Sequence, residues 1–231
     1  MFVKNLSFKY KNSKREILKD ISFNLKKDKV NVLVGLNGTG KTTLFDCITN
    51  ILKPNEGVLN FPSIDQILYL TQTIYFSPEL KGKDFVKFIS RIDNKVPFKF
   101  PESYTIKMDE RSRNLFLHLW NTKIGRMSVG EKRWLFITVL SGLKRKLYIL
   151  DEPTSGVDPS SRIRILKNID KLVKDGSYCF ISTHQLQDLS HIDCNIIMLH
   201  LGKVIYEGDY YKWLENNNTH NPDIAFDRSI E

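Results

Sequence analysis

The first third of the chain alternates apolar and polar residues with the period of half-buried strands. Apolar side chains occupy every second position in Asn5–Tyr10 and in Ile21–Leu25, and Lys29–Val34 is a short apolar run that precedes Gly35. Alternation predicts a strand with one buried face, whereas a continuous apolar run is typical of a central strand buried on both faces. We therefore expect antiparallel edge strands followed by a central strand.

The apolar period then changes to that of amphipathic helices. In Phe85–Ile92, apolar residues recur at i, i+3, i+4 and i+7, which places them on one face of a helix. Similar spacing predicts helices over Thr42–Ile51, Asn114–Asn121, Glu131–Leu143 and Arg162–Lys174. The residues Asp93–Arg113 are polar, contain two prolines and show no clear period, so we predict an irregular segment there.

Short apolar strands recur between these helices. We predict strands at Gln66–Leu70, Leu147–Leu150 and Tyr178–Ser182, and a hairpin around Gly202 that joins Ile196–Leu199 to Lys203–Glu207. Strands that alternate with helices predict an α/β fold with a mainly parallel sheet. The expected organisation is a single domain over residues 1–208 with an antiparallel β edge and a helical subdomain inserted at about 75–145. Residues 209–231 are expected to form a polar C-terminal tail.

The composition is that of a soluble globular protein with excess basic charge. Hydrophobic residues make up 41% of the 231 positions, and 35 basic against 26 acidic side chains give a formal net charge of +9. Such a charge fits nucleic acid, an anionic membrane surface, or no charged partner at all. No apolar run reaches the roughly 18 residues that suggest a membrane span, so we expect a cytoplasmic chain. Any membrane-spanning part would belong to another polypeptide.

The chain has three cysteines, Cys47, Cys179 and Cys194. No two of them form a Cys-x-x-Cys pair, and their number is odd. This pattern favours buried free thiols in a reducing compartment over a disulfide framework or a cysteine-rich zinc site.

The most specific motif is the glycine-rich segment Gly35–Thr42, which fits the P-loop pattern G-x-x-x-x-G-K-[ST] between a predicted strand and a predicted helix. Its glycines allow a tight turn whose backbone N–H groups point at phosphate oxygens, and the following helix presents its positive end to the same anion. Lys41 adds a positive charge near the β- and γ-phosphates, and the Thr42 hydroxyl can ligate Mg²⁺. The expected nucleotide-binding residues are Gly35, Asn37, Gly38, Thr39, Gly40, Lys41, Thr42 and Thr43.

A second motif places two carboxylates at the end of the apolar strand Leu147–Leu150. Ligands bind at the carboxyl ends of the strands in open α/β sheets, so Asp151 and Glu152 are expected beside the phosphate loop. Asp151 can hold Mg²⁺ directly or through water. Glu152 can polarise a water for in-line attack on a γ-phosphate.

Together the two motifs resemble the ATP-binding cassette (ABC) family of P-loop NTPases, from about Phe2 to Gly208. The resemblance implies ATP and Mg²⁺ as cofactors and ATP hydrolysis as the activity. It implies that Tyr10 stacks on adenine and that Gln72 reaches both the Mg²⁺ and the attacking water. It also implies that His184 contacts the γ-phosphate and that Asp158, in Ser155–Asp158, contacts an opposite subunit. Tyr10 could instead be an ordinary strand aromatic.

The family's signature, Leu-Ser-Gly-Gly-Gln, corresponds to Met127–Glu131 in this chain. Ser128 and Gly130 match the positions that contact ATP held by the partner subunit. Val129 and Glu131 replace a glycine and a glutamine, and a β-branched residue does not easily adopt a positive φ. The alternative interpretation is an ordinary helix cap, with Ser128 as the N-cap and Glu131 three residues later.

The leading hypothesis is therefore the ATPase subunit of a transporter, peripheral on the inner face of the cell membrane. Its partners would be an integral membrane permease and a second nucleotide-binding subunit, identical or different. Ser77–Leu80 before a helix resembles exporter-type members, which favours export, and Tyr75, Phe76 and Leu80 are candidates for the permease contact or for internal packing. The alternative is a soluble ABC ATPase acting on nucleic acid, ribosomes or iron–sulfur assembly, although a nucleic-acid partner is not favoured. The Asn-Lys-x-Asp motif of GTPases is absent.

Overall fold

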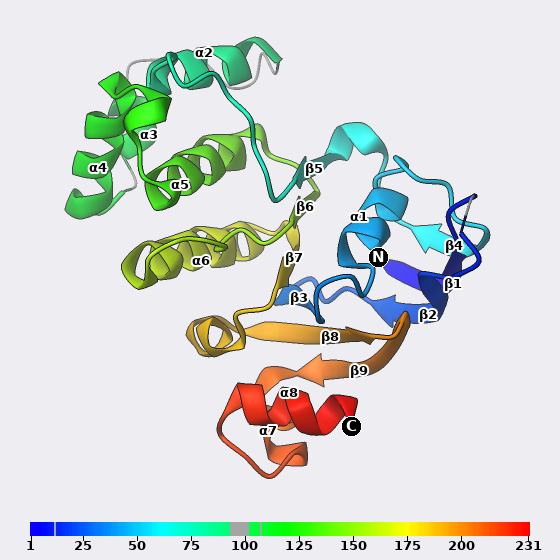
Figure 1. The fold of residues 1–231 in the computed structure, drawn as a ribbon. Helices are drawn as coiled ribbons and strands as arrows, with labels where there is room; N and C mark the ends of the chain where they lie inside the picture. Colours follow the sequence, from blue (N-terminus) through cyan, green and yellow to red (C-terminus); the bar gives the residue numbers. More distant parts are fainter. Residues whose placement is uncertain (12, 93–101, 107) are drawn as a thin grey trace. The chain divides into compact units, whose positions relative to one another are not determined.

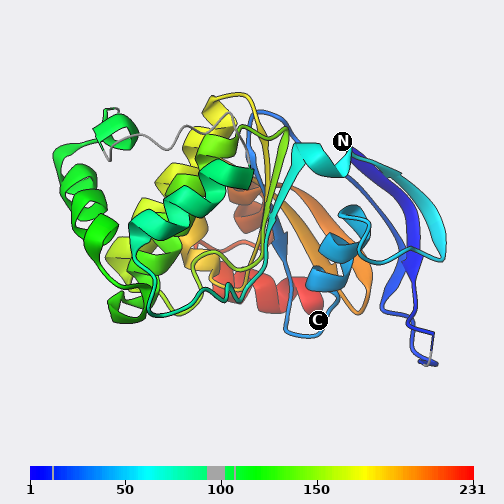
Figure 2. The same ribbon diagram turned by 90° about the horizontal axis from the view of Figure 1, so that it is seen from above.

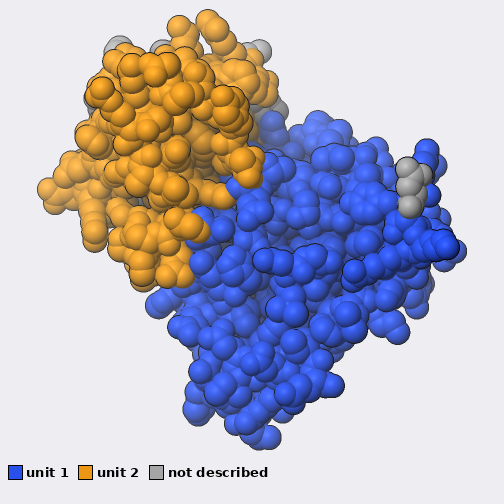
Figure 3. Space-filling view, in the orientation of Figure 1, with its two compact units in different colours: residues 1–72, 145–155, 169–231 blue, residues 73–144, 156–168 orange. Residues whose placement is uncertain are grey.

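The computed structural model describes residues 1–11, 13–92, 102–106 and 108–231. These residues form two compact units, which Figure 3 distinguishes by colour. Unit 1 comprises residues 1–72, 145–155 and 169–231, and unit 2 comprises residues 73–144 and 156–168. The inserted helical segment expected at about 75–145 falls almost wholly in unit 2, which also takes the first part of a later helix. Each unit is described by itself.

Unit 1 contains two β-sheets (Figure 1). The larger has the strand order β5-β6-β7-β3-β8-β9, in which β8 and β9 are antiparallel and the other pairs are parallel. The smaller has the order β2-β1-β4 and is antiparallel. The strand bounds are β1 Phe2–Phe8, β2 Leu18–Asn24, β3 Val30–Val34, β4 Glu56–Asn60, β5 Ile67–Leu70, β6 Leu147–Leu150, β7 Tyr178–Thr183, β8 Cys194–His200 and β9 Lys203–Asp209. The prediction of a mainly parallel sheet with an antiparallel edge is confirmed.

The helix α1, Lys41–Ile48, contributes to the main core of unit 1 together with strands of both sheets. Its Phe45 packs edge-on against Phe180 of β7, with ring centroids 5.1 Å apart. Phe23 of β2 contacts the same Phe180 ring at 5.7 Å. All five residues of β3 are buried, as expected of a central strand. This packing fixes the start of α1 just beyond the end of β3.

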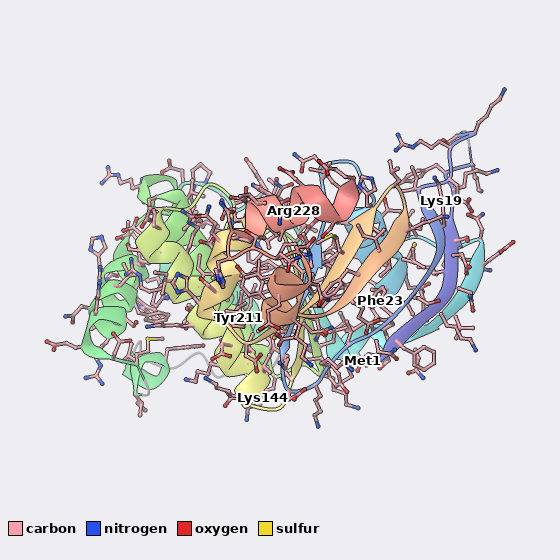
Figure 4. The ribbon with its side chains drawn as sticks, turned by 90° about the horizontal axis from the view of Figure 1, so that it is seen from below. Met1, Lys19, Phe23, Lys144, Tyr211 and Arg228 are labelled. Carbon is pink, nitrogen blue, oxygen red and sulfur yellow. The ribbon has the colours of Figure 1, made fainter. Side chains whose placement is uncertain are left out.

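The C-terminal segment is folded rather than a polar tail. It forms two helices that contact each other, α7, Tyr210–Asn216, and α8, Pro222–Ile230. Figure 4 labels Tyr211 of α7 and Arg228 of α8. The residues buried in this segment are Tyr210, Trp213, Leu214, Pro222, Ala225 and Phe226. Composition obscured this outcome, because the asparagines at positions 216–218 and 221 give the segment a polar character although apolar residues on both sides of them are buried. The Asn221 side chain caps α8 by accepting a hydrogen bond from the Asp223 N–H, and Pro222 begins that helix.

Unit 2 is helical (Figures 1 and 2). Its helices are α2 Gly82–Ile92, α3 Glu102–Thr105, α4 Glu110–Asn121, α5 Val129–Leu140 and the first part of α6, Pro159–Lys174. Short 3₁₀ turns occur at Ile64–Gln66 and Leu186–His191 in unit 1 and at Ile124–Arg126 and Ser141–Leu143 in unit 2. Phe85 and Phe136 join α2 to α5 with ring centroids 4.3 Å apart, and Phe76 packs on both rings.

The predicted irregular segment Asp93–Arg113 is partly outside the described residues, which omit 93–101 and 107. Within the described part the prediction was wrong, because α3 lies there and α4 begins at Glu110. Asp109 caps α4 by accepting hydrogen bonds from the Ser112 N–H and hydroxyl, at 2.9 and 2.8 Å. A side-chain cap and not an apolar period therefore marks this helix start.

Two further observations concern the whole described chain. The three cysteines are buried and free, as expected, and burial raises the pKa of each thiol, to about 12 for Cys47 and Cys194. Among the described residues, no helix combines the length and the apolar character needed to cross a bilayer.

Candidate functional site

The glycine-rich loop connects β3 to α1 and turns through two left-handed glycines. Gly38 has φ +79° and Gly40 has φ +106°, conformations that residues with a Cβ rarely adopt. Gly40 directly precedes α1 and has no side chain with which to cap it, so the N–H groups of the first turn face the loop. At Gly35 the reason for glycine is steric, because a Cβ there would lie 2.5 Å from the Leu199 carbonyl oxygen. The loop is thus a backbone cradle for an anion.

Lys41 lies buried at the base of this loop. Its ammonium donates hydrogen bonds to the carbonyl oxygens of Gly35, at 2.8 Å, and Leu36, at 3.1 Å. Burial lowers the pKa of Lys41, and the nearby Glu152 and Asp151 carboxylates partly oppose that shift. The loop therefore holds its lysine in place through its own backbone. Thr39 closes the turn by donating its hydroxyl proton to the Leu36 carbonyl oxygen at 2.8 Å.

Asp151 and Glu152 follow β6 directly, at the carboxyl edge of the larger sheet. The Thr42 hydroxyl donates to Asp151 Oδ2 at 2.8 Å, which joins the start of α1 to the end of β6. The Ser182 hydroxyl donates to the other oxygen, Oδ1, and accepts a hydrogen bond from the Glu152 N–H at 2.8 Å. Ser182 was predicted only as a strand residue. In the sequence, Ser182 is marked only by its small polar side chain near the end of an apolar strand.

The Glu152 carboxylate faces two other predicted site residues. Its Oε2 atom lies 2.9 Å from His184 Nδ1 and accepts a hydrogen bond from Gln72 Nε2 at 3.5 Å. Glu152 has φ +48°, in the left-handed region. The structure thus brings together Gln72, Glu152 and His184 from three separate positions in the chain.

Tyr10 lies beyond β1 and near the start of α1. Its hydroxyl is 3.3 Å from Thr43 Oγ1, and its ring meets Phe8 edge-on with centroids 4.9 Å apart. Tyr10 is 43% exposed, so part of it is accessible to a ligand. Its placement is compatible with contact to a planar base, and the edge-on contact with Phe8 fits the ordinary strand aromatic equally well.

Most of the predicted residues of the loop, together with both residues of the acidic strand end, line one pocket of about 360 Å³ in unit 1, whereas Gly35 and Thr39 do not line it. Its lining residues are Ile17, Asn37, Gly38, Gly40, Lys41, Thr42, Thr43, Gln72, Asp151 and Glu152. The backbone N–H groups and Lys41 can bind phosphate, while the hydroxyl and carboxylate oxygens of Thr42 and Asp151 are the hard donors that Mg²⁺ prefers. The donor set therefore fits a magnesium–nucleotide complex. Ile17 was not predicted, because its place beside the loop depends on the tertiary fold.

The signature segment lies at the start of α5, in unit 2. Ser128 Oγ accepts a hydrogen bond from the Glu131 N–H at 3.1 Å, and Glu131 Oε2 accepts one from the Ser128 N–H at 2.7 Å. This is the capping box foreseen by the alternative interpretation, and it uses the Glu131 carboxylate inside the turn. Val129 is the first residue of α5 and has no positive φ, so the anticipated backbone conflict does not arise.

Gly130 and Asp158 are neighbours within unit 2. A Cβ at Gly130 would lie 3.2 Å from Asp158 Oδ2 and 3.0 Å from the Ser161 side chain, so this contact favours glycine. Asp158 Oδ1 accepts hydrogen bonds from the Ser161 N–H at 3.0 Å and the Ser160 hydroxyl at 2.8 Å. Hydrogen bonding from the Ser161 side chain, the Ser161 N–H and the Ser160 hydroxyl lowers the pKa of Asp158 to about 2. The structure brings Ser128, Gly130 and Asp158 into one unit.

Comparison with known proteins gives a consistent result. The family model described as "ABC transporter" matches residues 18–155. Protein McbF of Escherichia coli is 30% identical over 223 residues, which cover 94% of this chain and 89% of McbF. The cobalt import ATP-binding protein CbiO of Salmonella typhimurium is 27% identical over 220 residues, covering 88% of this chain and 79% of CbiO.

A solved ATP-binding subunit of an ABC transporter shares the fold, with a TM-score of 0.78 and 22% identity over 99% of this chain and 98% of that one. The matched family region covers more than half of the present chain and contains both the phosphate loop and the acidic strand end. On these grounds the protein belongs to the ABC transporter family, as one of its ATP-binding and ATP-hydrolysing cassettes.

Proposed function

We propose that this chain is the ATPase subunit of a membrane transporter and that it hydrolyses MgATP in the 360 Å³ pocket. The observation that carries the proposal is the convergence of the glycine-rich loop, Lys41, Thr42 and the two strand-end carboxylates on that pocket. The N–H groups of the loop and the Lys41 ammonium bind the phosphates. Thr42 and Asp151 would hold the Mg²⁺, and Gln72 also lines the pocket. When bound, Mg²⁺ neutralises charge on the phosphate oxygens.

In this proposal Glu152 acts as the general base. Its carboxylate lies at the end of β6 between Gln72 and His184, where it can accept a proton from a water that attacks the γ-phosphate. His184 holds the carboxylate in place before ATP binds and contacts the γ-phosphate afterwards. Gln72 orients the water, and Tyr10 stacks on the base.

The second proposal concerns the partner subunit. Ser128, Gly130 and Asp158 lie together in unit 2, and in this proposal they serve the ATP of another copy or of a related chain. The start of α5 would then meet the γ-phosphate across the interface. Because the Glu131 carboxylate is held by the Ser128 N–H, its charge is directed into the turn. We expect this contact to be weaker than one with glutamine at the same position.

A membrane permease would bind through unit 2. Tyr75 is 88% exposed, and Leu80, Phe88 and Ile92 are also exposed there, which provides an apolar surface for a helix of the permease. Phe76, in contrast, packs against Phe85, Phe88 and Phe136, so we assign it to internal packing. The expected export direction has no support from the relatives, since CbiO is named as an import protein. The proposal therefore specifies no direction.

The test of hydrolysis is Glu152→Gln, measured with Glu56→Gln as an exposed control. We expect ATP binding to persist and turnover to fall by roughly a hundredfold or more, the upper part of the range for general acid–base catalysis. Unchanged turnover would remove Glu152 from the mechanism. Purification from membranes should recover a multi-span protein with the tagged chain. Recovery of ribosomes or DNA instead would favour the soluble ABC ATPase.

A further inference from the structure

Ser182 occupies a position in β7 that the proposed mechanism does not use. Its side chain is fully buried and lies beside the two strand-end carboxylates. The hydroxyl donates its proton to Asp151 Oδ1 and accepts the Glu152 N–H at 2.8 Å. A serine hydroxyl has one donor and two acceptor sites, so it makes both contacts at once.

The parallel pairing of β6 with β7 creates this arrangement. Leu150 pairs with Ile181, and one residue further along both strands this register places Asp151 beside Ser182. The backbone of Asp151 is held from the other side, where its N–H donates to the Leu70 carbonyl oxygen at 2.8 Å. The position of Ser182 relative to Asp151 is therefore set by the centre of the larger sheet and not by a loop.

The two oxygens of Asp151 have separate partners. Oδ1 accepts from Ser182, and Oδ2 accepts from Thr42 at 2.8 Å. With Oδ1 fixed to β7, the carboxylate plane cannot rotate freely, and Oδ2 stays directed toward the start of α1. An oxygen that already points at Thr42 is placed to share a cation with the Thr42 hydroxyl.

The contact with Glu152 acts on the backbone. Glu152 has φ +48°, a conformation that non-glycine residues adopt only when the surroundings hold it. The hydrogen bond from its N–H to Ser182 Oγ supplies such a restraint. The turn that aims the Glu152 carboxylate toward Gln72 and His184 thus depends on the same hydroxyl that orients Asp151.

We propose that Ser182 is a positioning residue for both carboxylates. By fixing Asp151 Oδ2, it sets the Mg²⁺ response of the site, which is the increase in ATP affinity that Mg²⁺ produces. The inference rests on the proposed assignment of Mg²⁺ to Thr42 and Asp151. It predicts a defect in magnesium-dependent nucleotide binding rather than in phosphate binding by the loop. Partners that orient metal ligands typically change metal affinity or activity by about 10–100-fold when they are lost.

The experiment compares Ser182→Ala, Ser182→Thr and Ser182→Val by calorimetric titration with ATP, in EDTA and over a series of Mg²⁺ concentrations. Threonine and valine have almost the same shape, and only threonine retains the hydroxyl. Any crowding from the added methyl group is therefore shared by these two variants. Ser7→Ala is the matched control, since it removes another buried hydroxyl of unit 1 that accepts a backbone N–H, from Asp20 at 3.0 Å.

We expect the alanine and valine variants to lose about 10–100-fold in Mg²⁺-enhanced ATP affinity, with affinity in EDTA within about twofold of the parent. Threonine should restore most of the Mg²⁺ response, and Ser7→Ala should keep all of it. Equal Mg²⁺ responses in Ser182→Thr and Ser182→Val, or a full response in Ser182→Ala, would overturn the role of Ser182 and leave the assignment of Mg²⁺ to Thr42 and Asp151 intact. If the parent protein showed no Mg²⁺ effect, the magnesium assignment itself would fall, and the present inference with it.

Discussion

The substitution Trp213→Ala tests whether the C-terminal segment is part of the fold. Trp213 is 1% exposed, although it lies in a segment whose composition indicates a polar tail. Its ring packs against Tyr210 with centroids 6.1 Å apart, and its indole N–H donates to Ser229 Oγ of α8 at 3.0 Å. Loss of this side chain should therefore remove packing within α7 and the link from α7 to α8.

The structure supports an estimate of the cost. Truncating a buried tryptophan to alanine lowers the free energy of unfolding by about 3–5 kcal/mol. Loss of the hydrogen bond adds little beyond that range, because Ser229 Oγ still donates to the Ala225 carbonyl oxygen at 2.8 Å and is not left without a partner. We expect a loss of about 4 kcal/mol, which corresponds to a fall in Tm of roughly 8–16 °C for a chain of this size.

Urea denaturation followed by circular dichroism measures this loss. Trp213→Phe keeps an aromatic ring without the N–H donor and should cost about 1–2 kcal/mol. Tyr211→Ala is the control on the same helix, because Tyr211 is 55% exposed, and should cost less than about 1 kcal/mol. If Trp213→Ala cost no more than Tyr211→Ala, the packing of α7 and α8 described above would be incorrect.

Three further predictions concern the nucleotide site and unit 2. Lys41→Ala should reduce ATP affinity below calorimetric detection while the chain stays folded by circular dichroism, and an affinity within tenfold of the parent would contradict the role given to Lys41. Glu131→Gln should change the free energy of unfolding by less than about 0.5 kcal/mol in urea titrations, because a glutamine oxygen can also accept from the Ser128 N–H, whereas Glu131→Ala should cost about 1 kcal/mol. Asp158 has a folded pKa of about 2, below the unfolded value of about 3.9, so it stabilises the folded state above pH 4 and loses that effect as the pH falls through 2. Asp158→Asn should therefore flatten the loss of stability between pH 4 and pH 2, and an acid titration with the slope of the parent would contradict this linkage.

The elements with the strongest local patterns could be predicted from the sequence. The continuous apolar run of β3 and the glycine spacing of Gly35–Thr42 each favour one local conformation. The mainly parallel sheet was predicted from the alternation of apolar strands with helices along the chain. β4, Glu56–Asn60, was not predicted, because most of its residues are exposed and show no apolar alternation. It forms because the edge of β1 offers backbone partners, from Phe2↔Asn60 to Ser7↔Glu56.

The site was predictable where a motif fixes both residue type and place, as for Lys41 and Asp151. Contacts that depend on register between distant strands were not. Ser182 reaches Asp151 only through the pairing of β6 with β7, and Gly35 must be glycine because the Leu199 carbonyl oxygen of β8 lies against it. The register between distant strands cannot be inferred from the residue pattern of a single sequence, so these contacts were not predicted.

The burial of Cys47, Cys179 and Cys194 has a practical consequence for spectroscopy. Each thiol is shielded from solvent, and burial keeps it protonated near neutral pH, so maleimide reagents should leave the native protein unlabelled. One cysteine introduced at Val129, which is 49% exposed at the start of α5, would then be the only reactive position. A spin label or fluorophore attached there would report the distance between two copies of the chain without any native thiol having to be removed.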